Sequence, residues 1–208
     1  MSDADPAAGM VRCLRADVRM LVRQHASRAK RIAVVLTNRG LHAIFLYRLS
    51  HALWKSRVPL LPLIFTRLSQ HLFAVDIDPA AELGPGVAIV HGFGLVIGRG
   101  ARVEGNCCLF HGVTLGNRGS EWIGSNLQDG QPVLERGIIV GAGAKILGPI
   151  RIGRNSVIGA NAVVLKDVPP CSIAAGVPAR VIGQRPEMDE NLRRVDGYGA
   201  RAPGPADD

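Results

Sequence analysis

Residues 134–164 read LERGIIVGAGAKILGPIRIGRNSVIGANAVV, with an aliphatic residue at every sixth position. The spacing continues toward the N-terminus across two interruptions, and the positions are Ile77, Leu83, Ile89, Ile97, Val103, Leu109, Leu115, Leu134, Val140, Ile146, Ile152, Ile158 and Val164. A six-residue period fits neither a helix nor a long alternating strand, but it does fit a short strand followed by a corner. Three such units form one coil, so the pattern predicts a parallel β-solenoid with the aliphatic residues stacked in one core.

The positions four residues after each repeated aliphatic are also mostly small or apolar, Phe93 and Cys107 among them, and we expect them to face the core. The period slips twice. The first slip adds two residues around Gly94 to Val96, and the second runs from Asn117 to about Val133. Extra residues must leave a regular solenoid as a bulge or a loop, and a loop this long usually carries function or closes over a site.

The residues before the solenoid follow a different period. Between about Ala16 and Phe73 the apolar residues recur at intervals of three and four, which is typical of helices. Gly40 and the stretch 58–62, which contains two prolines, are the expected breaks.

Composition agrees with this organisation, because 25 Gly, 13 Pro and only 4% aromatic residues suit a chain that turns many tight corners around an aliphatic core. We therefore expect a mainly β fold in three parts. These parts are a helical region at 1–74, a β-solenoid domain at 75–183 with an extruded loop at about 117–133, and a mobile tail at 184–208.

The four cysteines are Cys13, Cys107, Cys108 and Cys171. They form no CxxC pair, so neither a disulfide framework nor a metal site is expected, and Cys107 and Cys108 are interpreted as structural. The first thirty residues contain no continuous apolar stretch, and the apolar run near Val58 is too short to span a bilayer. We expect a cytoplasmic protein without a signal peptide.

The formal net charge is +8, and much of the excess lies early, at Arg12, Arg15, Arg19, Arg23, Arg28, Lys30 and Arg31. Nucleic acid, an anionic membrane surface and a phosphorylated ligand are possible partners for such a stretch. Because no aromatic residues interleave with these charges, a solvated helix face is the favoured interpretation. We expect neither a nucleic-acid partner nor a membrane partner.

His91 and His111 each stand third in a six-residue unit, one coil apart once the first slip is allowed for. They are therefore expected to be neighbours on one face, one beside a bulge and the other before the long loop. A lone histidine is more often structural than catalytic, but two stacked at these positions are candidate general bases. Asp76 is a candidate partner that would orient the imidazole, although a carboxylate at a helix-to-strand junction also serves as an ordinary cap.

Five segments resemble bacterial serine O-acetyltransferases, and the similarity extends from about Ala16 to Gly183. The segments are GLHAIFLYRLSHALW at 40–54, VDIDPAAELGPG at 75–86, HGVTLG at 111–116, GAGAKILGPIRIG at 141–153 and AAGVPARVIG at 174–183. The last two occur widely among hexapeptide-repeat acetyltransferases. The first three are more particular to the serine enzymes.

The resemblance implies a left-handed parallel β-helix, homotrimers or dimers of trimers, and acetyl-CoA bound along the solenoid between subunits, with no metal. The helical region at 1–74 is expected on the oligomerisation and acceptor side. It assigns the catalytic pair to Asp76 and His91, with His91 taking the proton from the acceptor hydroxyl. The positions it implies for the acetyl-CoA site are Gly116, Asn117, Ala142, Ala160, Lys166 and Arg180.

The chain departs from the family pattern at three places on the acceptor side. His25 stands where the family has an acidic residue, and Val90 replaces an Asp before the catalytic His. Gly130 and Gln131 stand where the family has an Arg-His pair. The candidate acceptor site consists of His25, Val90, His111 and Gln131. Charged partners for a zwitterionic serine are thus missing, which predicts acetyl transfer to another hydroxyl compound, such as a sugar, an amino acid derivative or a natural-product intermediate.

Two alternatives stay open. One is an ordinary serine O-acetyltransferase of cysteine biosynthesis, and the other is a non-catalytic trimeric scaffold, against which the retained Asp76 and His91 argue. The serine enzymes often bind cysteine synthase through a C-terminal isoleucine. This chain ends in Ala206, Asp207 and Asp208, so that complex is not expected.

Overall fold

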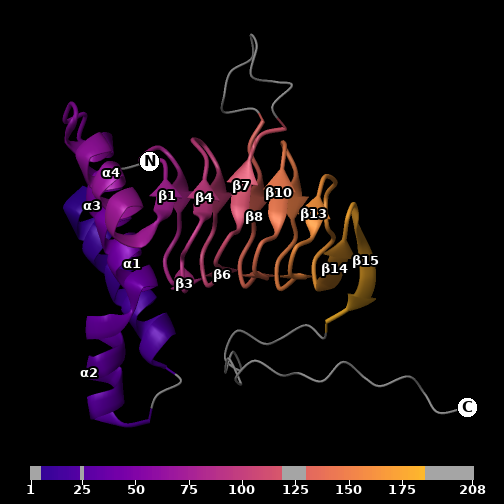
Figure 1. Ribbon diagram of the computed structural model, residues 1–208, viewed down its shortest axis with the longest axis horizontal. Helices are drawn as coiled ribbons and strands as arrows, with labels where there is room; N and C mark the ends of the chain where they lie inside the picture. Colours follow the sequence, from indigo (N-terminus) through magenta and orange to yellow (C-terminus); the bar gives the residue numbers. More distant parts are fainter. Residues whose placement is uncertain (1–5, 24–25, 119–129, 186–208) are drawn as a thin grey trace, which may run out of the picture.

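The computed structural model describes residues 6–23, 26–118 and 130–185. Its helices are α1 (Pro6–Val22), α2 (Arg28–Thr37), α3 (Arg39–Lys55) and α4 (Leu61–Phe73). They lie at one end of the solenoid, and the antiparallel pair β14 and β15 lies at the other (Figure 1).

The strands run in order along the chain. They are β1 (Val75–Ile77), β2 (Glu82–Leu83), β3 (Ala88–Val90), β4 (Leu95–Ile97), β5 (Arg102–Val103), β6 (Cys108–Phe110), β7 (Thr114–Gly116), β8 (Val133–Leu134), β9 (Ile139–Val140), β10 (Lys145–Leu147), β11 (Arg151–Ile152), β12 (Val157–Ile158), β13 (Val163–Val164), β14 (Ser172–Gly176) and β15 (Ala179–Gln184).

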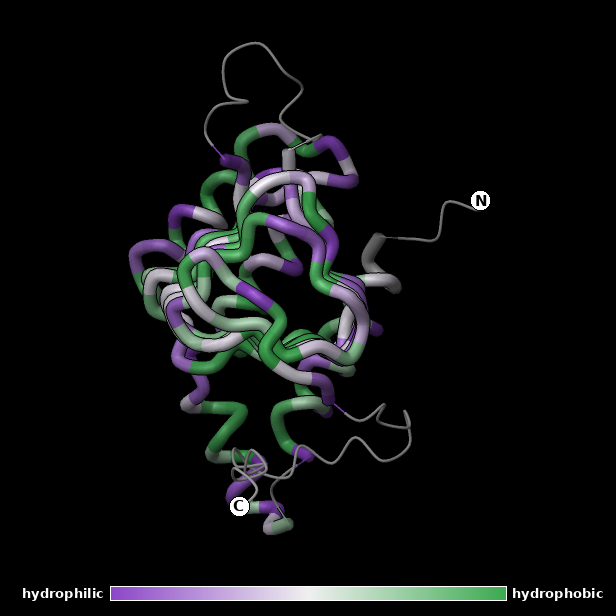
Figure 2. Tube along the Cα trace, turned by 90° about the vertical axis from the view of Figure 1, so that its right-hand side faces the viewer, coloured by the Kyte–Doolittle hydropathy of each residue, from purple (hydrophilic) through white to green (hydrophobic). Residues whose placement is uncertain are grey.

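These strands form three sheets, one for each side of a triangular coil. The sheet orders are β1-β4-β7-β10-β13, β2-β5-β8-β11 and β3-β6-β9-β12-β14-β15, and all neighbours except β14 and β15 are parallel. Successive coils overlie one another when seen along the axis (Figure 2). The predicted left-handed parallel β-helix behind a helical region is confirmed.

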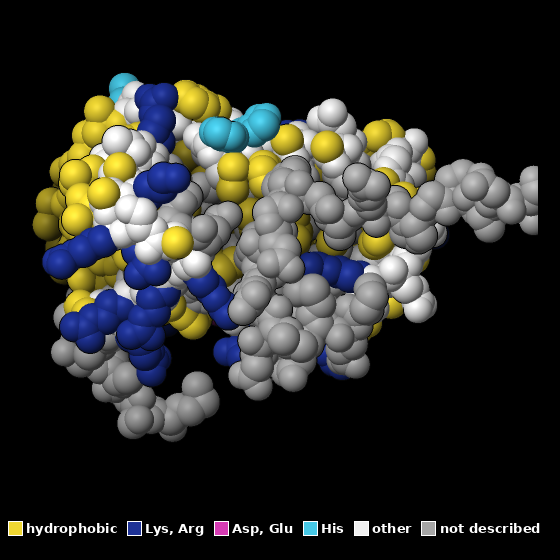
Figure 3. All heavy atoms as spheres, turned by 90° about the horizontal axis from the view of Figure 1, so that it is seen from below, with side chains coloured by type: hydrophobic (Ala, Val, Ile, Leu, Met, Phe, Trp, Pro, Cys, Tyr) yellow, Lys and Arg dark blue, Asp and Glu magenta, His cyan; other side chains and the backbone are white. Residues whose placement is uncertain are grey.

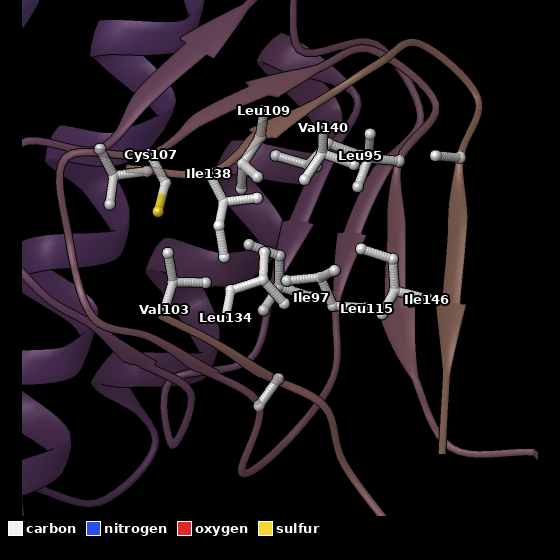
Figure 4. Packing of buried hydrophobic residues seen from close by; sticks show 14 of the residues in the cluster. Leu95, Ile97, Val103, Cys107, Leu109, Leu115, Leu134, Ile138, Val140 and Ile146 are labelled. Atoms are coloured by element: carbon white, nitrogen blue, oxygen red, sulfur yellow. The ribbon is translucent and has the colours of Figure 1, made fainter. Parts of the chain in front are cut away.

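The core follows the six-residue period. All thirteen repeated aliphatics are between 0% and 6% exposed, and their side chains stack along the inside of the coils (Figure 4). Burial of this kind contributes about 25 cal/mol per Å² of apolar surface removed from water, so the repeat itself supplies the main stabilising term.

The first slip lies slightly earlier than the sequence predicts. Phe93 is 48% exposed, so the expectation that it faces the core is wrong, and the fully buried Leu95 takes the inward position. The two extra residues therefore lie in the corner at 91–94, before β4, and not around Gly94 to Val96. The six-residue count fixes how many residues are extra but not which side of a corner they occupy.

Helix α3 is held against the first coil by polar side chains from a segment that carried the family resemblance. The Tyr47 hydroxyl donates to the Ala81 carbonyl at 2.7 Å and accepts from the Leu83 N–H at 3.2 Å. The His51 Nδ1 atom lies 2.8 Å from the Pro79 carbonyl, to which it donates. These bonds satisfy backbone groups at the open end of the solenoid that no further coil covers.

A buried ion pair joins α1 to the same coil. Arg48 donates to the Asp17 carboxylate at 3.0 Å, and both side chains are almost fully buried. The Asp17 Oδ1 atom also accepts from the N–H groups of Gly86 and Val87, each at 2.9 Å. Three elements distant in sequence thus meet at one carboxylate.

The cysteines are all free thiols. Burial raises the pKa of the Cys108 thiol to about 12, with a further contribution from Cys107, so this thiol stays protonated and is a poor nucleophile. Among the described residues no group of three or more His, Cys, Asp or Glu side chains is arranged to hold a metal ion. In the same residues no helix is long and apolar enough to cross a membrane.

Candidate active site

One corner of the solenoid gathers several of the predicted site residues. It joins the sheet of β3, β6, β9 and β12 to the sheet of β4, β7, β10 and β13. His91 follows β3, His111 follows β6, Ala142 lies just after β9 and Ala160 just after β12. Backbone bonds link this corner from coil to coil, for example from the Gly143 N–H to the His111 carbonyl at 2.9 Å.

The two histidines are neighbours, as the spacing predicts. Their ring centroids are 6.0 Å apart, and the angle between the ring planes is 65°. His91 has φ +64° at the start of the bulge, a conformation that is uncommon for a residue with a side chain and costs of order 1–3 kcal/mol. The bulge thus turns His91 outward beside His111, and both rings are exposed.

His91 opens onto a cavity of about 230 Å³ between the bulge and the start of α3. The lining residues are Val34, Thr37, Asn38, Arg39, Gly40, His91 and Phe93. Liquid water occupies about 30 Å³ per molecule, so the volume equals that of roughly eight waters and admits a small organic molecule.

The close approach of α3 shapes this cavity. A Cβ atom on Gly40 would lie 2.1 Å from the Ile89 carbonyl oxygen, so only glycine lets the helix pack this tightly on β3. Asn38 caps the helix by accepting from the Leu41 N–H at 2.8 Å. The result places Asn38 and Arg39 across the cavity from His91.

Charge in the cavity is positive. The Arg39 guanidinium lies 4.6 Å from the centroid of the Phe93 ring, an arrangement that holds the cation at the cavity wall. None of the described lining residues is acidic. A ligand group close to Arg39 is therefore favoured when it is anionic or a hydrogen-bond acceptor, and disfavoured when it is a cation.

Asp76 and Val90 lie on strands of different sheets, β1 and β3. Asp76 is the outward residue of β1 and is half-buried, and Val90 is the outward residue at the end of β3. Among the described residues no hydrogen bond or ion pair joins Asp76 to His91. The orienting role of Asp76 therefore stays a prediction.

The positions predicted for acetyl-CoA fall into three groups. Ala142 and Ala160 share the corner of the histidines, where their methyl side chains leave space outside the coil. Gly116, Asn117 and Lys166 lie at the opposite ends of β7 and β13, on the next corner. Arg180 is exposed on β15, at the end of the solenoid far from the helices.

Gln131 lies away from His91 within this chain. Its side-chain oxygen would be 3.0 Å from a Cβ atom on Gly98, at the end of β4 remote from the histidine corner. This oxygen is buried and has no hydrogen-bond partner among the described residues. His25 and most of the long loop, 119–129, lie outside the described residues.

Three residues near the histidine corner escaped the sequence reasoning. Arg39 and Phe93 line the cavity, and the Lys145 Nζ atom donates to the Gly112 carbonyl at 2.6 Å and to the Thr114 hydroxyl at 3.0 Å. The register slip next to Phe93 was a signal that this position belonged to the site. Nothing in the sequence pattern marked Arg39, because its position depends on how α3 packs.

Several known proteins are similar to this chain in both sequence and fold. The family of bacterial transferase hexapeptide repeats (six repeats) matches residues 132–166. A serine acetyltransferase of Mycobacterium tuberculosis is 41% identical over 175 residues, which cover 84% of this chain and 74% of that protein. The crystal structure of serine acetyltransferase from Brucella abortus has a TM-score of 0.78 at 40% identity and covers 86% of this chain and 70% of that chain. A second structure of that enzyme, in complex with coenzyme A, has a TM-score of 0.78 at 39% identity, with coverages of 86% and 69%.

A six-residue repeat that builds a left-handed β-helix, with an exposed histidine pair beside a cavity, defines an acyltransferase of the hexapeptide-repeat class. The sequence identity and the coverage of the relatives narrow this class to one family. The chain belongs to the serine acetyltransferase family. The resemblance drawn from the sequence segments is thereby confirmed, and the scaffold alternative gives way to an enzyme.

Proposed function

We propose that this chain transfers an acetyl group from acetyl-CoA to a hydroxyl of a small acceptor, with His91 as the general base. The observation that carries the proposal is the position of His91, exposed on a strained bulge and open to a cavity of about 230 Å³. A base must reach the proton it removes, and the cavity supplies room for the acceptor beside the imidazole.

In the proposed reaction, acetyl-CoA supplies a thioester carbonyl. The acceptor hydroxyl oxygen forms a bond to this carbonyl carbon while His91 accepts the hydroxyl proton. The carbon–sulfur bond then breaks, and the proton on His91 passes to the leaving thiolate, which restores the neutral imidazole. Asp76 is the proposed partner that stabilises the imidazolium between these two transfers.

Small residues on successive coils of the histidine corner support binding of the extended acetyl-CoA arm along this corner. From His91 to Ala160 the corner advances three coils, or about 14 Å at roughly 4.8 Å per coil. Ala142 and Ala160 leave this line open, and Arg180 is an exposed cation toward its far end, suited to a phosphate group. Gly116, Asn117 and the exposed Lys166 lie on a different corner, which fits a site shared between subunits of a homotrimer.

L-serine is the first candidate acceptor. The relatives are named serine acetyltransferases at about 40% identity over most of the chain, and this favours the ordinary serine enzyme over the altered acceptor that the sequence departures predict. A serine hydroxymethyl group is also small enough for the cavity beside His91.

A hydroxyl compound without an ammonium group is the second candidate, and the charge of the cavity favours it. Arg39 and His91 are the ionisable residues among the described lining residues, and neither attracts a cation. Val90 adds an apolar side chain where a carboxylate would hold an ammonium. Such a site suits a neutral or anionic acceptor.

The deciding experiment compares L-serine with glycerate, which has a hydroxyl in place of the ammonium and is otherwise the same size. Release of free thiol from acetyl-CoA is measured with each acceptor, and with a panel of monosaccharides. Preference for L-serine by about a hundredfold in kcat/KM supports the first candidate, since losing charge-assisted contacts to an ammonium costs about that factor. A preference for glycerate or a sugar supports the second. If no hydroxyl acceptor stimulates thiol release, the proposed function is wrong.

A further inference from the structure

Arg39 is a cation in the wall of the cavity beside His91, and it has no carboxylate of its own. It is the first residue of α3. In the part of the chain that the structure describes, no ion pair joins it to an acidic side chain. Figure 3 shows one face of the molecule on which histidine side chains lie near Lys and Arg, with no Asp or Glu visible among the described residues of that face. Such a cation is available to an anionic group of a ligand.

Two contacts hold the Arg39 guanidinium in place. It lies 4.6 Å from the centroid of the Phe93 ring, and its Nη2 atom donates to the Leu72 carbonyl at 3.4 Å. A guanidinium has several N–H donors in one plane, so the bond to Leu72 leaves donors for a further acceptor. Phe93 lies on the same corner of the coil as His91, and both line the cavity. One corner therefore positions the proposed base and supports the cation.

The start of α3 adds to the charge of Arg39. The Asn38 side-chain oxygen accepts from the Leu41 N–H, so its amide N–H groups are the part of this side chain left for a ligand. The N-terminal end of a helix also carries partial positive charge, and residues 38–40 line the cavity at that end of α3. Both effects favour an anionic group beside Arg39.

The cavity volume suits a small hydroxy acid. It is about 230 Å³, the volume of roughly eight waters. An acceptor the size of L-serine or glycerate, roughly seven non-hydrogen atoms, fills this space, whereas a hexose does not fit within it whole. A phosphate monoester carries more negative charge, and Arg39 is the only permanent cation among the described lining residues. A single carboxylate matches that charge better.

We propose that Arg39 binds the carboxylate of the acceptor, and that the acceptor is a small hydroxy acid and not a sugar or a neutral alcohol. The carboxylate lies against the guanidinium, and the hydroxyl points across the cavity toward His91. This role rests on the proposed function, to which it adds the chemical class of the acceptor and the residue that selects it. L-serine and glycerate both belong to the class, so either candidate acceptor is compatible with it.

The test measures kcat/KM for thiol release from acetyl-CoA with two matched pairs of acceptors, glycerate with glycerol and L-serine with serinol. Within each pair a hydroxymethyl group replaces the carboxylate and the rest of the molecule is unchanged. We expect the unchanged chain to prefer the carboxylate in at least one pair by about tenfold to a hundredfold, because a charge-assisted contact to Arg contributes roughly that factor. Faster turnover of glycerol 3-phosphate than of both acids would overturn the choice of a carboxylate.

Three variants assign the preference to Arg39. Arg39→Gln should reduce it at least about tenfold, mainly through a higher KM for the acid, and should leave KM for acetyl-CoA within about twofold. Arg39→Lys should restore part of it, because lysine keeps the charge without the planar fork. Arg67→Gln, at an exposed position on α4 outside the cavity, is the matched control and should keep the full preference. A merely structural role of Arg39 would slow both members of a pair alike.

Calorimetric titration of glycerate and of L-serine into each CoA-saturated protein separates the Arg39 contact from catalysis, and circular dichroism establishes that each variant folds. If no hydroxyl acceptor stimulates thiol release, the proposed function is wrong, yet weaker binding of either acid by Arg39→Gln than by Arg67→Gln still supports the contact. Equal carboxylate preference in these two variants overturns the role of Arg39 and leaves the proposed function standing. No preference for a carboxylate by the unchanged chain also overturns this role. Neither thiol release nor binding of either acid overturns both.

Discussion

Replacing Asp17 with Ala is expected to destabilise the chain by about 3 to 5 kcal/mol. The change leaves the Arg48 guanidinium buried without its carboxylate, and breaking a buried ion pair from one side costs about that much. The N–H groups of Gly86 and Val87 also lose their acceptor, at about 1–3 kcal/mol for each group that stays buried and unsatisfied. Because α1 can partly relax away from the solenoid and let water reach these groups, we expect the total loss of unfolding free energy to stay near the 3 to 5 kcal/mol of the ion pair alone, still about that figure.

The variant Asp17→Asn separates the cost of the lost negative charge from the cost of the lost hydrogen-bond acceptor. Asparagine keeps one oxygen for the N–H groups of Gly86 and Val87 but removes the negative charge beside Arg48, so we expect it to cost less than Ala. Arg19→Ala, at an exposed position on the same helix, is the control and is expected to cost less than about 0.5 kcal/mol.

The assay is urea denaturation followed by circular dichroism at one fixed protein concentration, because assembly contributes to the apparent stability. A cost below about 1 kcal/mol for Asp17→Ala would refute the reasoning, since it would mean that the carboxylate is not what anchors α1. An equal cost for Asn and Ala would show that the charge alone matters.

Three further outcomes are expected. Gly40→Ala should lower the free energy of unfolding by at least about 2 kcal/mol and weaken acceptor turnover, since its Cβ would lie 2.1 Å from the Ile89 carbonyl oxygen. Leu115→Ala should cost about 2 to 5 kcal/mol in denaturant, because the removed side chain is fully buried in the stack. Burial lowers the pKa of His51 below its ordinary 6.5, so its contribution to stability is present above pH 6.5 and is lost as the pH falls through the lowered value. The variant His51→Asn keeps a donor for the Pro79 carbonyl but does not titrate, so its melting temperature should fall less steeply with decreasing pH than that of the unchanged chain. An equal dependence of the melting temperature on pH in the two proteins would contradict this role of His51.

The solenoid was predictable from the sequence because its burial pattern repeats locally. Each coil places the same position inward, so Ile146 or Ile158 needs no knowledge of the rest of the chain to be assigned to the core. The same regularity predicts that His91 and His111 are neighbours. Phe93 was assigned wrongly because the count alone does not locate two extra residues within a corner.

The helical region was less predictable, because packing direction decides its chemistry. The spacing of Leu61, Ile64 and Leu68 indicates a helix whichever way that face points. Asp17 meets Arg48 across 31 residues, and Arg39 enters the cavity only because Gly40 lets α3 approach β3 closely. Such contacts depend on the placement of whole elements, which the sequence pattern does not specify.

Thiol release from acetyl-CoA by His91→Ala, compared with His111→Ala and with the unchanged chain, tests the general-base assignment most directly. General-base catalysis contributes about 10² to 10⁴ in rate, so His91→Ala should lose at least a hundredfold in kcat with a smaller change in KM for acetyl-CoA. His111→Ala should lose less than about tenfold, since we propose that it lines the acceptor side and is not the base. Activity of His91→Ala within about tenfold of the unchanged chain would contradict the account.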